Sequence, residues 1–390
     1  MIYRFQDCEL DTETHELKRD GEVHPVEPRV FTLLHFLIEN RDRLVGRDEI
    51  FEHVWEGRIV SDSALSSQIK AVRRAIGDDG KSQSLIRTIH GQGFRFVGQI
   101  DLGSPVTIPE RAANQVIQYC RTSDDVRLAY ASVGEGPPIL KTANWLNHLE
   151  YDWESPVWSH LLRALSRENR LVRYDERGTG LSDWNVSDLS LGRCVEDLES
   201  IVEAAGLDRF ALFGVSQGAS ISVDYAVRHP ERVSHLVLYG GYARGWMVRN
   251  DPEEIEKRKA MVTLMRHGWG SNNPAFRQVF TSLFIPGGSP AQMTWFNDLQ
   301  RITASPEHAV HHSLATADYD ITELLPQVTV PTLVLHCTDD AVVPYREGQE
   351  LAMNIPGAHF KSLSGSNHLI LEDEPAWPTF INEVQNFLKG

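Results

Sequence analysis

The sequence predicts a multidomain protein in which a small α+β domain precedes a larger α/β domain with a helical cap. Three observations support this prediction. Residues 1–98 contain helical patterns followed by a hairpin pattern. From residue 115 onward, strand-like and helical segments alternate. A stretch with glycine, serine and proline lies between these two regions. We therefore expect domains over 1–98 and 115–390, joined by a linker over 99–114.

The composition is that of a globular protein with a strong negative charge. The 390 residues are 41% hydrophobic and have a net charge of −16, which excludes wholesale disorder and opposes global binding to nucleic acid. A DNA contact must come from a local basic patch, and residues 58–95 hold seven basic side chains against three acidic ones. Four scattered cysteines and the lack of an apolar run of about 18 residues predict a cytoplasmic protein without disulfides or a membrane span.

Two early segments have the spacing of amphipathic helices. Apolar residues over 30–40 and over 47–55 recur every three or four positions, which is typical of a helix that buries one face. The positions are Val30, Leu33, Leu34, Leu37 and Ile38 in the first segment, and Ile50, Val54 and Trp55 in the second. We expect both helices to pack in the core of the small domain.

A third helix is predicted over 61–76, with an apolar stripe formed by Leu65, Ile69, Val72 and Ile76. Small hydroxyls and long cations lie off this stripe. A helix face of this kind suits the DNA major groove, because hydroxyls approach the bases closely while cations reach phosphates. The alternative is an ordinary solvated face. The candidate DNA-contacting residues are Ser63, Ser66, Ser67, Lys70, Arg73 and Arg74.

Residues 85–98 follow as two β-prone runs joined by Gly91-Gln92-Gly93, which predicts a hairpin. With this hairpin, residues 3–98 resemble the OmpR/PhoB-type winged helix-turn-helix domain. The resemblance implies that the third helix enters the major groove of operator DNA and that Arg95 of the wing reaches the minor groove. His90 departs from the family pattern, which commonly has arginine there, and the receiver domain that usually regulates this module is absent.

The larger domain contains a candidate nucleophile. Residues 209–230 have the pattern of a strand, a sharp turn and a helix, with Gly214-Val215-Ser216-Gln217-Gly218 at the turn. Such a turn exposes the serine hydroxyl and aims the helix N-terminus at the reacting carbonyl, and its crowding requires small residues two positions away on each side. We predict that Ser216 is a nucleophile.

A serine nucleophile needs a base and an acid that orients the base. His368 follows a strand and a small-residue loop, and Asp339-Asp340 follows the apolar strand 331–337, so the chain order is Ser, Asp, His. With this order, residues 115–389 resemble the α/β-hydrolase fold. The resemblance implies that the acid is Asp340, three residues after Cys337, which takes the place of the family's glycine.

The same resemblance implies an oxyanion hole made by the backbone N–H groups of Gln217 and Trp145. The family commonly has His-Gly after its third strand, whereas this chain has Ala143-Asn144 there. Residues 170–183 match the strand and turn after the first long helix, and we expect Asp175, Arg177 and Gly180 of this segment to be structural.

An insertion over about 243–320 is rich in helix formers and aromatic residues and is expected to form the cap over Ser216. A few of its aromatic side chains are expected to line a pocket for a small apolar or ester-like molecule. The spacing of histidine, cysteine and glycine residues predicts neither a metal site nor a nucleotide cofactor.

These features favour a one-component transcription regulator with DNA and a small-molecule ligand as partners, working as a homodimer. The hydrolase domain is then a sensor that binds its ligand and hydrolyses it quickly, slowly or not at all. A metabolic serine hydrolase with an accessory N-terminal domain is the main alternative. A third possibility is a regulator whose hydrolase domain only mediates dimerisation.

Overall fold

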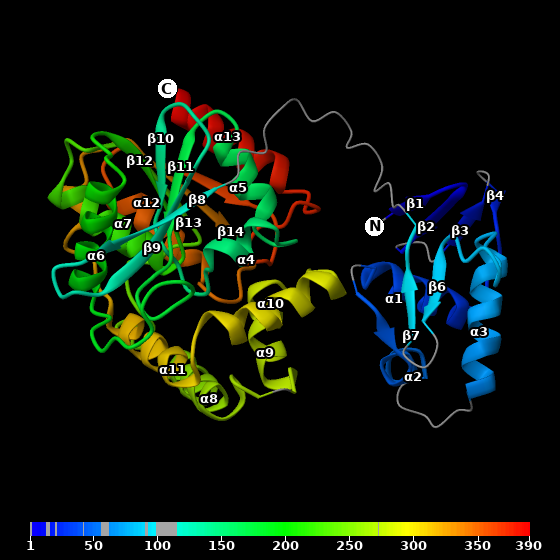
Figure 1. The fold of residues 1–390 in the computed structure, drawn as a ribbon. Coiled ribbons are helices and arrows are strands. Elements are labelled where there is room, and N and C mark those ends of the chain that lie inside the picture. The colour runs from blue at the N-terminus through cyan, green and yellow to red at the C-terminus, as the bar shows by residue number, and fades with distance from the viewer. Residues whose placement is uncertain are drawn as a thin grey trace. The chain divides into compact units, whose positions relative to one another are not determined.

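A computed structural model describes residues 2–12, 16–19, 22–41, 43–55, 62–89, 93–98, 115–271 and 273–390. The chain divides into two compact units at residue 112, and we describe each by itself (Figure 1). The linker predicted over 99–114 lies outside the described residues. None of the helices in the described part of the chain is both long and apolar enough to cross a membrane.

The first unit begins with a four-stranded antiparallel sheet that the sequence patterns did not predict. Its strands have two to four residues, too few to give a clear alternation, yet Phe5, Leu10 and Leu17 point from them into the core. In chain order the strands are β1 (Ile2–Phe5), β2 (Cys8–Asp11), β3 (Glu16–Arg19) and β4 (Glu22–Val23).

Three helices and a second, three-stranded sheet complete this unit. The predicted apolar stripes are buried, and residues such as Leu37, Val72 and Phe96 form one core. Gly93 is needed where its strand pairs with the strand at Val45–Gly46, because an added Cβ there would lie 2.0 Å from the Val45 carbonyl oxygen. The elements are α1 (Pro28–Glu39), β5 (Val45–Gly46), α2 (Arg47–Trp55), α3 (Asp62–Ala75), β6 (Ile86–Ile89) and β7 (Gly93–Phe96).

The second unit is built on an eight-stranded sheet in the order β15-β14-β13-β12-β10-β11-β9-β8. The six strands from β15 to β11 in this order pair in parallel, while β9 and β8 pair antiparallel at the edge. The strands are β8 (Val116–Arg121), β9 (Arg127–Val133), β10 (Pro138–Lys141), β11 (Arg170–Tyr174), β12 (Phe210–Val215), β13 (Val233–Tyr239), β14 (Thr332–Cys337) and β15 (His359–Leu363).

Helices cover both faces of this sheet, which explains the continuous apolar runs of its central strands. One core joins the sheet to α6 (Leu191–Ala204), α7 (Gln217–Arg228) and α12 (Tyr345–Asn354). The other joins it to α5 (Ser159–Ser166) and α13 (Trp377–Lys389). This arrangement confirms the predicted α/β-hydrolase fold.

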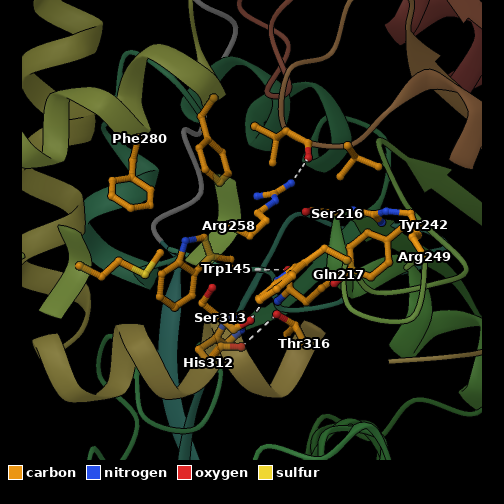
Figure 2. A pocket seen from close by; sticks show the side chains of 15 residues that line it. Trp145, Ser216, Gln217, Tyr242, Arg249, Arg258, Phe280, His312, Ser313 and Thr316 are labelled. Carbon is orange, nitrogen blue, oxygen red and sulfur yellow. Dashed lines mark hydrogen bonds between the residues drawn. The ribbon is translucent and has the colours of Figure 1, made fainter. Parts of the chain in front are cut away.

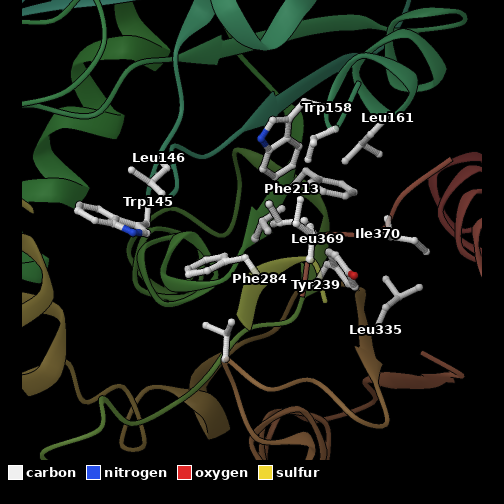
Figure 3. Close-up of a cluster of buried hydrophobic side chains, with 14 of the residues drawn as sticks. Trp145, Leu146, Trp158, Leu161, Phe213, Tyr239, Phe284, Leu335, Leu369 and Ile370 are labelled. Carbon is white, nitrogen blue, oxygen red and sulfur yellow. The ribbon is translucent and has the colours of Figure 1, made fainter. Parts of the chain in front are cut away.

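The predicted insertion contains four helices that lie together at one end of the sheet (Figure 1). They are α8 (Pro252–Gly268), α9 (Ala275–Phe284), α10 (Pro290–Thr303) and α11 (Pro306–Ala315). Their inward aromatic side chains join the core of the sheet, as the cluster around Phe284, Trp145 and Leu369 shows (Figure 3). The cap is therefore packed firmly on the loops that follow the strands.

Candidate functional site

Ser216 lies at the turn between β12 and α7 in a strained backbone conformation. Its φ is +55° and its ψ is −127°, a combination that few residues other than glycine adopt. The flanking glycines are required sterically. A Cβ at Gly214 would lie 2.7 Å from the Ala219 Cα, and one at Gly218 would lie 2.7 Å from the Ala143 carbonyl oxygen. The surrounding structure thus fixes this turn with the serine at its apex.

Ser216 opens into a pocket beneath the cap (Figure 2). Its side chain reaches this cavity although the residue is only 9% exposed. The pocket walls come from the loop after β10, the start of α7 and the cap helices, and are mostly apolar. The lining residues are Trp145, Ser216, Gln217, Tyr242, Trp246, Arg249, Arg258, Met265, Phe280, Phe284, His312, Ser313, Thr316, Val342 and Val343.

Asp340 and His368 meet beside this turn, although 28 residues separate them in the chain. His368 Nδ1 lies 2.7 Å from Asp340 Oδ2, while Asp340 Oδ1 accepts the Val342 and Val343 N–H groups at 2.8 and 3.0 Å. Burial alone would raise the pKa of Asp340, but the imidazole and the backbone N–H groups hold that pKa below its ordinary value. An ionised Asp340 therefore accepts a hydrogen bond from Nδ1–H, and in this tautomer Nε2 is the nitrogen with a free lone pair.

His368 Nε2 is buried and, within the described residues, has no hydrogen-bond partner, the Ser216 hydroxyl included. The cap holds this residue, since the backbone N–H of His368 donates to the Phe284 carbonyl at 2.8 Å and the two rings meet edge to face at 5.4 Å. Gly240, which the sequence analysis did not single out, has a φ of +57° and passes under the imidazole. A Cβ there would lie 3.1 Å from His368 Cε1.

One of the two predicted oxyanion donors is already occupied. The Trp145 N–H donates to Gln217 Oε1 at 2.9 Å, so the Gln217 side chain covers the donor. Gln217 Nε2 is buried and has no hydrogen-bond partner among the described residues. The Trp145 ring stacks on His312 of α11 at 4.2 Å, which fixes the loop against the cap. Any other acceptor must displace Gln217 Oε1 to reach the Trp145 N–H.

Buried polar groups stabilise the loop after β10, which contains Trp145. Lys141 donates to Asn144, and Asn147 donates to Asp175 at 2.7 Å. Burial raises the pKa of Asp175 to about 8 and lowers the pKa of Lys141 to about 7. Arg177, by contrast, is neutralised by close ion pairs with Asp197 and Asp124 at 2.5 and 2.9 Å. Asp175 and Arg177 thus bind other parts of the scaffold, and neither lines the pocket.

The small unit presents part of the predicted DNA-contacting set on α3. Ser66, Ser67, Lys70 and Arg74 are exposed. The side chain of Ser63 lies outside the described residues, as does His90 at the tip of the hairpin. Arg73 is placed differently from the prediction, because it is 9% exposed and its Nη2 donates to the Ile86 carbonyl and the Thr88 hydroxyl at 2.7 and 2.8 Å. Arg73 therefore joins α3 to the wing.

The wing carries two exposed arginines on facing strands. Arg95 of β7 is paired with Arg87 of β6 in the antiparallel register, so both side chains lie on the same face of the hairpin. Arg95 Nε donates to the Arg41 carbonyl at 3.0 Å, which leaves its terminal nitrogens outward. Arg87 was not among the predicted contacts, and the alternation within β6 was the only sequence signal for it.

Among the described residues, no group of three or more histidine, cysteine, aspartate or glutamate side chains is arranged to hold a metal ion. The pocket arginines Arg249 and Arg258 were also not predicted. They come from the cap, where the sequence around them has the strongly charged composition of a solvent-exposed helix.

Comparison with known proteins agrees with both units. Residues 21–96 match the family described as "Transcriptional regulatory protein, C terminal", and residues 151–375 match the family described as "Serine aminopeptidase, S33". A protein named "Putative carbamate hydrolase RutD" from Rhizobium rhizogenes is 27% identical over 245 residues, which is 60% of this chain and 87% of that protein.

Solved structures resemble the second unit in fold. An esterase from Exiguobacterium antarcticum has a TM-score of 0.60 and 22% identity, with 70% of this chain and 100% of that chain covered. A thermophilic esterase from Thermogutta terrifontis has a TM-score of 0.57 and 24% identity, with 71% and 98% covered. The chain therefore belongs to the α/β-hydrolase family described as serine aminopeptidase S33, and it carries an OmpR/PhoB-type DNA-binding regulatory domain ahead of the hydrolase domain.

Proposed function

We propose that the protein is a one-component transcription regulator whose hydrolase domain senses a small ester-like molecule and hydrolyses it. One observation carries this proposal: a single chain combines an exposed cationic face on α3 with a buried His368–Asp340 pair beside a strained serine. The first feature fits DNA phosphates, and the second fits acyl transfer. Such a regulator acts in the cytoplasm, where its DNA lies.

In the proposed chemistry, Ser216 Oγ attacks the carbonyl carbon of the ester while His368 Nε2 takes the hydroxyl proton. The carbonyl oxygen becomes an oxyanion that accepts the Gln217 N–H and, after the Gln217 side chain moves, the Trp145 N–H. Collapse of the intermediate expels the alcohol, which receives the proton from Nε2. Water then attacks the acyl-serine with the same base and releases the acid. A carbamate is the substrate class in a relative's name, and a carbamate ester would react through the same steps, expelling its alcohol and releasing a carbamic acid.

DNA recognition is assigned to α3 and the wing. Ser66, Ser67, Lys70 and Arg74 form the face that enters the major groove, and Arg95 and Arg87 extend the cationic surface along the hairpin. Arg73 is left out because its guanidinium is bound within the unit. One winged helix makes few contacts, so we propose a homodimer that binds two half-sites.

Ligand binding is proposed to change the affinity for DNA. A molecule beneath the cap shifts operator binding only if it favours one arrangement of the dimer over another. A coupling free energy of about 1–3 kcal/mol would change operator affinity by about 5- to 150-fold.

The test is a gel shift of the full-length protein on the promoter of its own gene and on fragments selected from a random pool. The probe ligand is 4-nitrophenyl hexanoate, applied to Ser216→Ala so that turnover does not consume it. We expect DNA binding whose affinity changes several-fold at saturating ester. Ester hydrolysis without any DNA binding would instead support the metabolic hydrolase, and equal affinity with and without bound ester would reject the sensor.

A further inference from the structure

The pocket above Ser216 has mixed walls with a concentration of positive charge. Eight of its fifteen lining residues are aromatic or aliphatic, five carry a hydroxyl, amide or imidazole group, and the remaining two, Arg249 and Arg258, are cations. No aspartate or glutamate lines it. Charged groups are costly to bury in such surroundings unless they are paired. The question is therefore which partner each arginine has.

Arg249 is fully paired within the protein. Its Nε donates to Glu254 Oε2 at 2.9 Å, its Nη2 donates to the other oxygen of the same carboxylate, and its Nη1 donates to the Arg244 carbonyl at 2.6 Å. The side chain is 3% exposed. This bidentate pair neutralises both Arg249 and Glu254 and leaves neither available to a ligand.

Arg258 is not paired in this way. It is held at one end, where Nη2 donates to the Val342 carbonyl, and it lies 3.7 Å from the carboxylate that Arg249 already occupies. Its Nε and Nη1 have no hydrogen-bond partner among the described residues, its side chain is 27% exposed, and the residue lines the pocket. Figure 2 shows the guanidinium in the interior of the pocket, in the same part as Ser216.

The carboxylates near Arg258 are shared with other groups. Glu254 lies 3.7 Å from Arg258 Nη2, but both of its oxygens accept hydrogen bonds from Arg249. The charge of Asp340 also acts on Arg258, and that carboxylate is bound to His368. Arg258 Nε and Nη1 thus remain N–H donors that no group of the described residues accepts.

We propose that the ligand of the pocket is an ester that also bears a carboxylate, and that Arg258 binds this carboxylate while Ser216 faces the ester carbonyl. This inference rests on the proposed hydrolase function and names its substrate class. A guanidinium donates two parallel N–H groups to one carboxylate, which fixes the orientation of the molecule as well as its charge. The aromatic and aliphatic walls then take the carbon chain between the two ends.

The pocket charge favours a monoanionic group over a dianionic phosphate. Arg249 is bound bidentately by Glu254, so Arg258 is the pocket cation whose Nε and Nη1 remain free among the described residues. One carboxylate can accept both of these N–H groups, and a second negative charge would find no further free cation in the pocket lining. A wholly neutral ester offers these N–H groups no charged acceptor, so it is expected to be the poorer substrate.

The experiment compares two 4-nitrophenyl esters of equal chain length, the hexanoate and the half-ester of adipic acid. We expect kcat/KM of the wild-type protein to be at least about tenfold higher for the adipate half-ester. Arg258→Met, which keeps an apolar side chain of similar length, should lower this ratio by about 10- to 100-fold, mainly through KM. Arg258→Lys should restore part of the preference.

Arg266→Met is the matched control, because Arg266 lies on the same helix, is exposed and does not line the pocket. It should leave the ratio unchanged. The proposal would be overturned if the wild-type protein preferred the hexanoate. It would also be overturned if the preference for the adipate half-ester survived in both Arg258 variants. Thermal unfolding of each variant checks that it is folded.

Calorimetry separates this proposal from the hydrolase proposal. Ser216→Ala is titrated with monomethyl adipate and with methyl hexanoate, so that no turnover is required. The carboxylate site is supported if the adipate binds more tightly than the hexanoate and if this difference is lost in the double variant with Arg258→Met. This result would hold even if the wild-type and Ser216→Ala proteins hydrolysed esters equally poorly. Equal binding of both probes rejects the site even if hydrolysis by Ser216 is established.

Discussion

The two functional surfaces of this protein are built in opposite ways. The proposed DNA-contacting face of α3 takes its exposed side chains from a single helix of 14 residues. The site at Ser216 joins the turn after β12, the loops after β10 and β14, and His368 after β15, so its parts span more than half of the chain. A local surface depends on helical periodicity, whereas the assembled site depends on which strand ends lie side by side in the sheet.

Helical periodicity gives two neighbouring arginines of α3 different environments. Arg73 and Arg74 are adjacent, but Arg73 is four residues after Ile69 and three before Ile76, which places it on the buried stripe. Its charge is tolerated there because it donates to Ile86 and Thr88 and lies 3.7 Å from Asp78. Arg74 is one position further around the helix and reaches solvent.

The largest expected effect is the loss of the nucleophile in the assembled site. Ser216→Ala should abolish labelling by a fluorophosphonate probe and lower ester hydrolysis by at least about 10³-fold, because the carbonyl then has no group to form the acyl intermediate. Ser313→Ala is the control, since this serine also lines the pocket but lies away from the turn. Labelling of the Ser216→Ala protein at the wild-type level would mean that the elbow is only structural.

Alanine substitutions of the two arginines of α3 should affect different properties, DNA binding for Arg74 and stability for Arg73. Arg74→Ala, alone or with Lys70→Ala, should weaken DNA binding and reduce its salt dependence by about one unit of slope for each lost phosphate contact, with unchanged stability. Arg73→Ala should cost about 2–4 kcal/mol of stability in the small unit, because buried acceptors lose their donor.

Hydrogen exchange over residues 62–98 measures the stability of the small unit, and gel shifts at several salt concentrations measure the slope. If Arg73→Ala keeps the wild-type protection from hydrogen exchange but binds DNA more weakly and with a smaller salt dependence, Arg73 contacts DNA after all. If Arg74→Ala leaves both quantities unchanged, α3 does not have the assigned role.

The smallest expected effect concerns the covered oxyanion donor. Gln217→Met removes the carbonyl that accepts the Trp145 N–H and keeps the volume of the side chain. We expect kcat/KM for 4-nitrophenyl hexanoate to rise by about two- to tenfold, because one hydrogen bond no longer has to break, while the melting temperature falls slightly. A fall in kcat/KM with an unchanged melting temperature would show that the Gln217 side chain assists the reaction instead.

Much of the fold was predictable because its signals are local. The helices over 30–40, 47–55 and 61–76 and the G-x-S-x-G turn rest on patterns within about a dozen residues, and each has its counterpart in the structure. The sheet from β1 to β4 was missed because its strands are too short for alternation to stand out. Arg258 was missed because its helix has a charged sequence, and only the packing of the cap places this residue, with Met265, at the pocket.

The sequence by itself therefore determined the two domain types, the chain order of Ser216, Asp340 and His368, and the exposed cations of α3. These follow from residue type and spacing, which act over short distances along the chain. Only the tertiary structure decided that Gln217 covers the Trp145 N–H, that Arg73 binds the wing and that Arg258 is bound to the Val342 carbonyl in the pocket. Each of these depends on a donor and an acceptor far apart in sequence, and their distance is set by the packing of strands and cap.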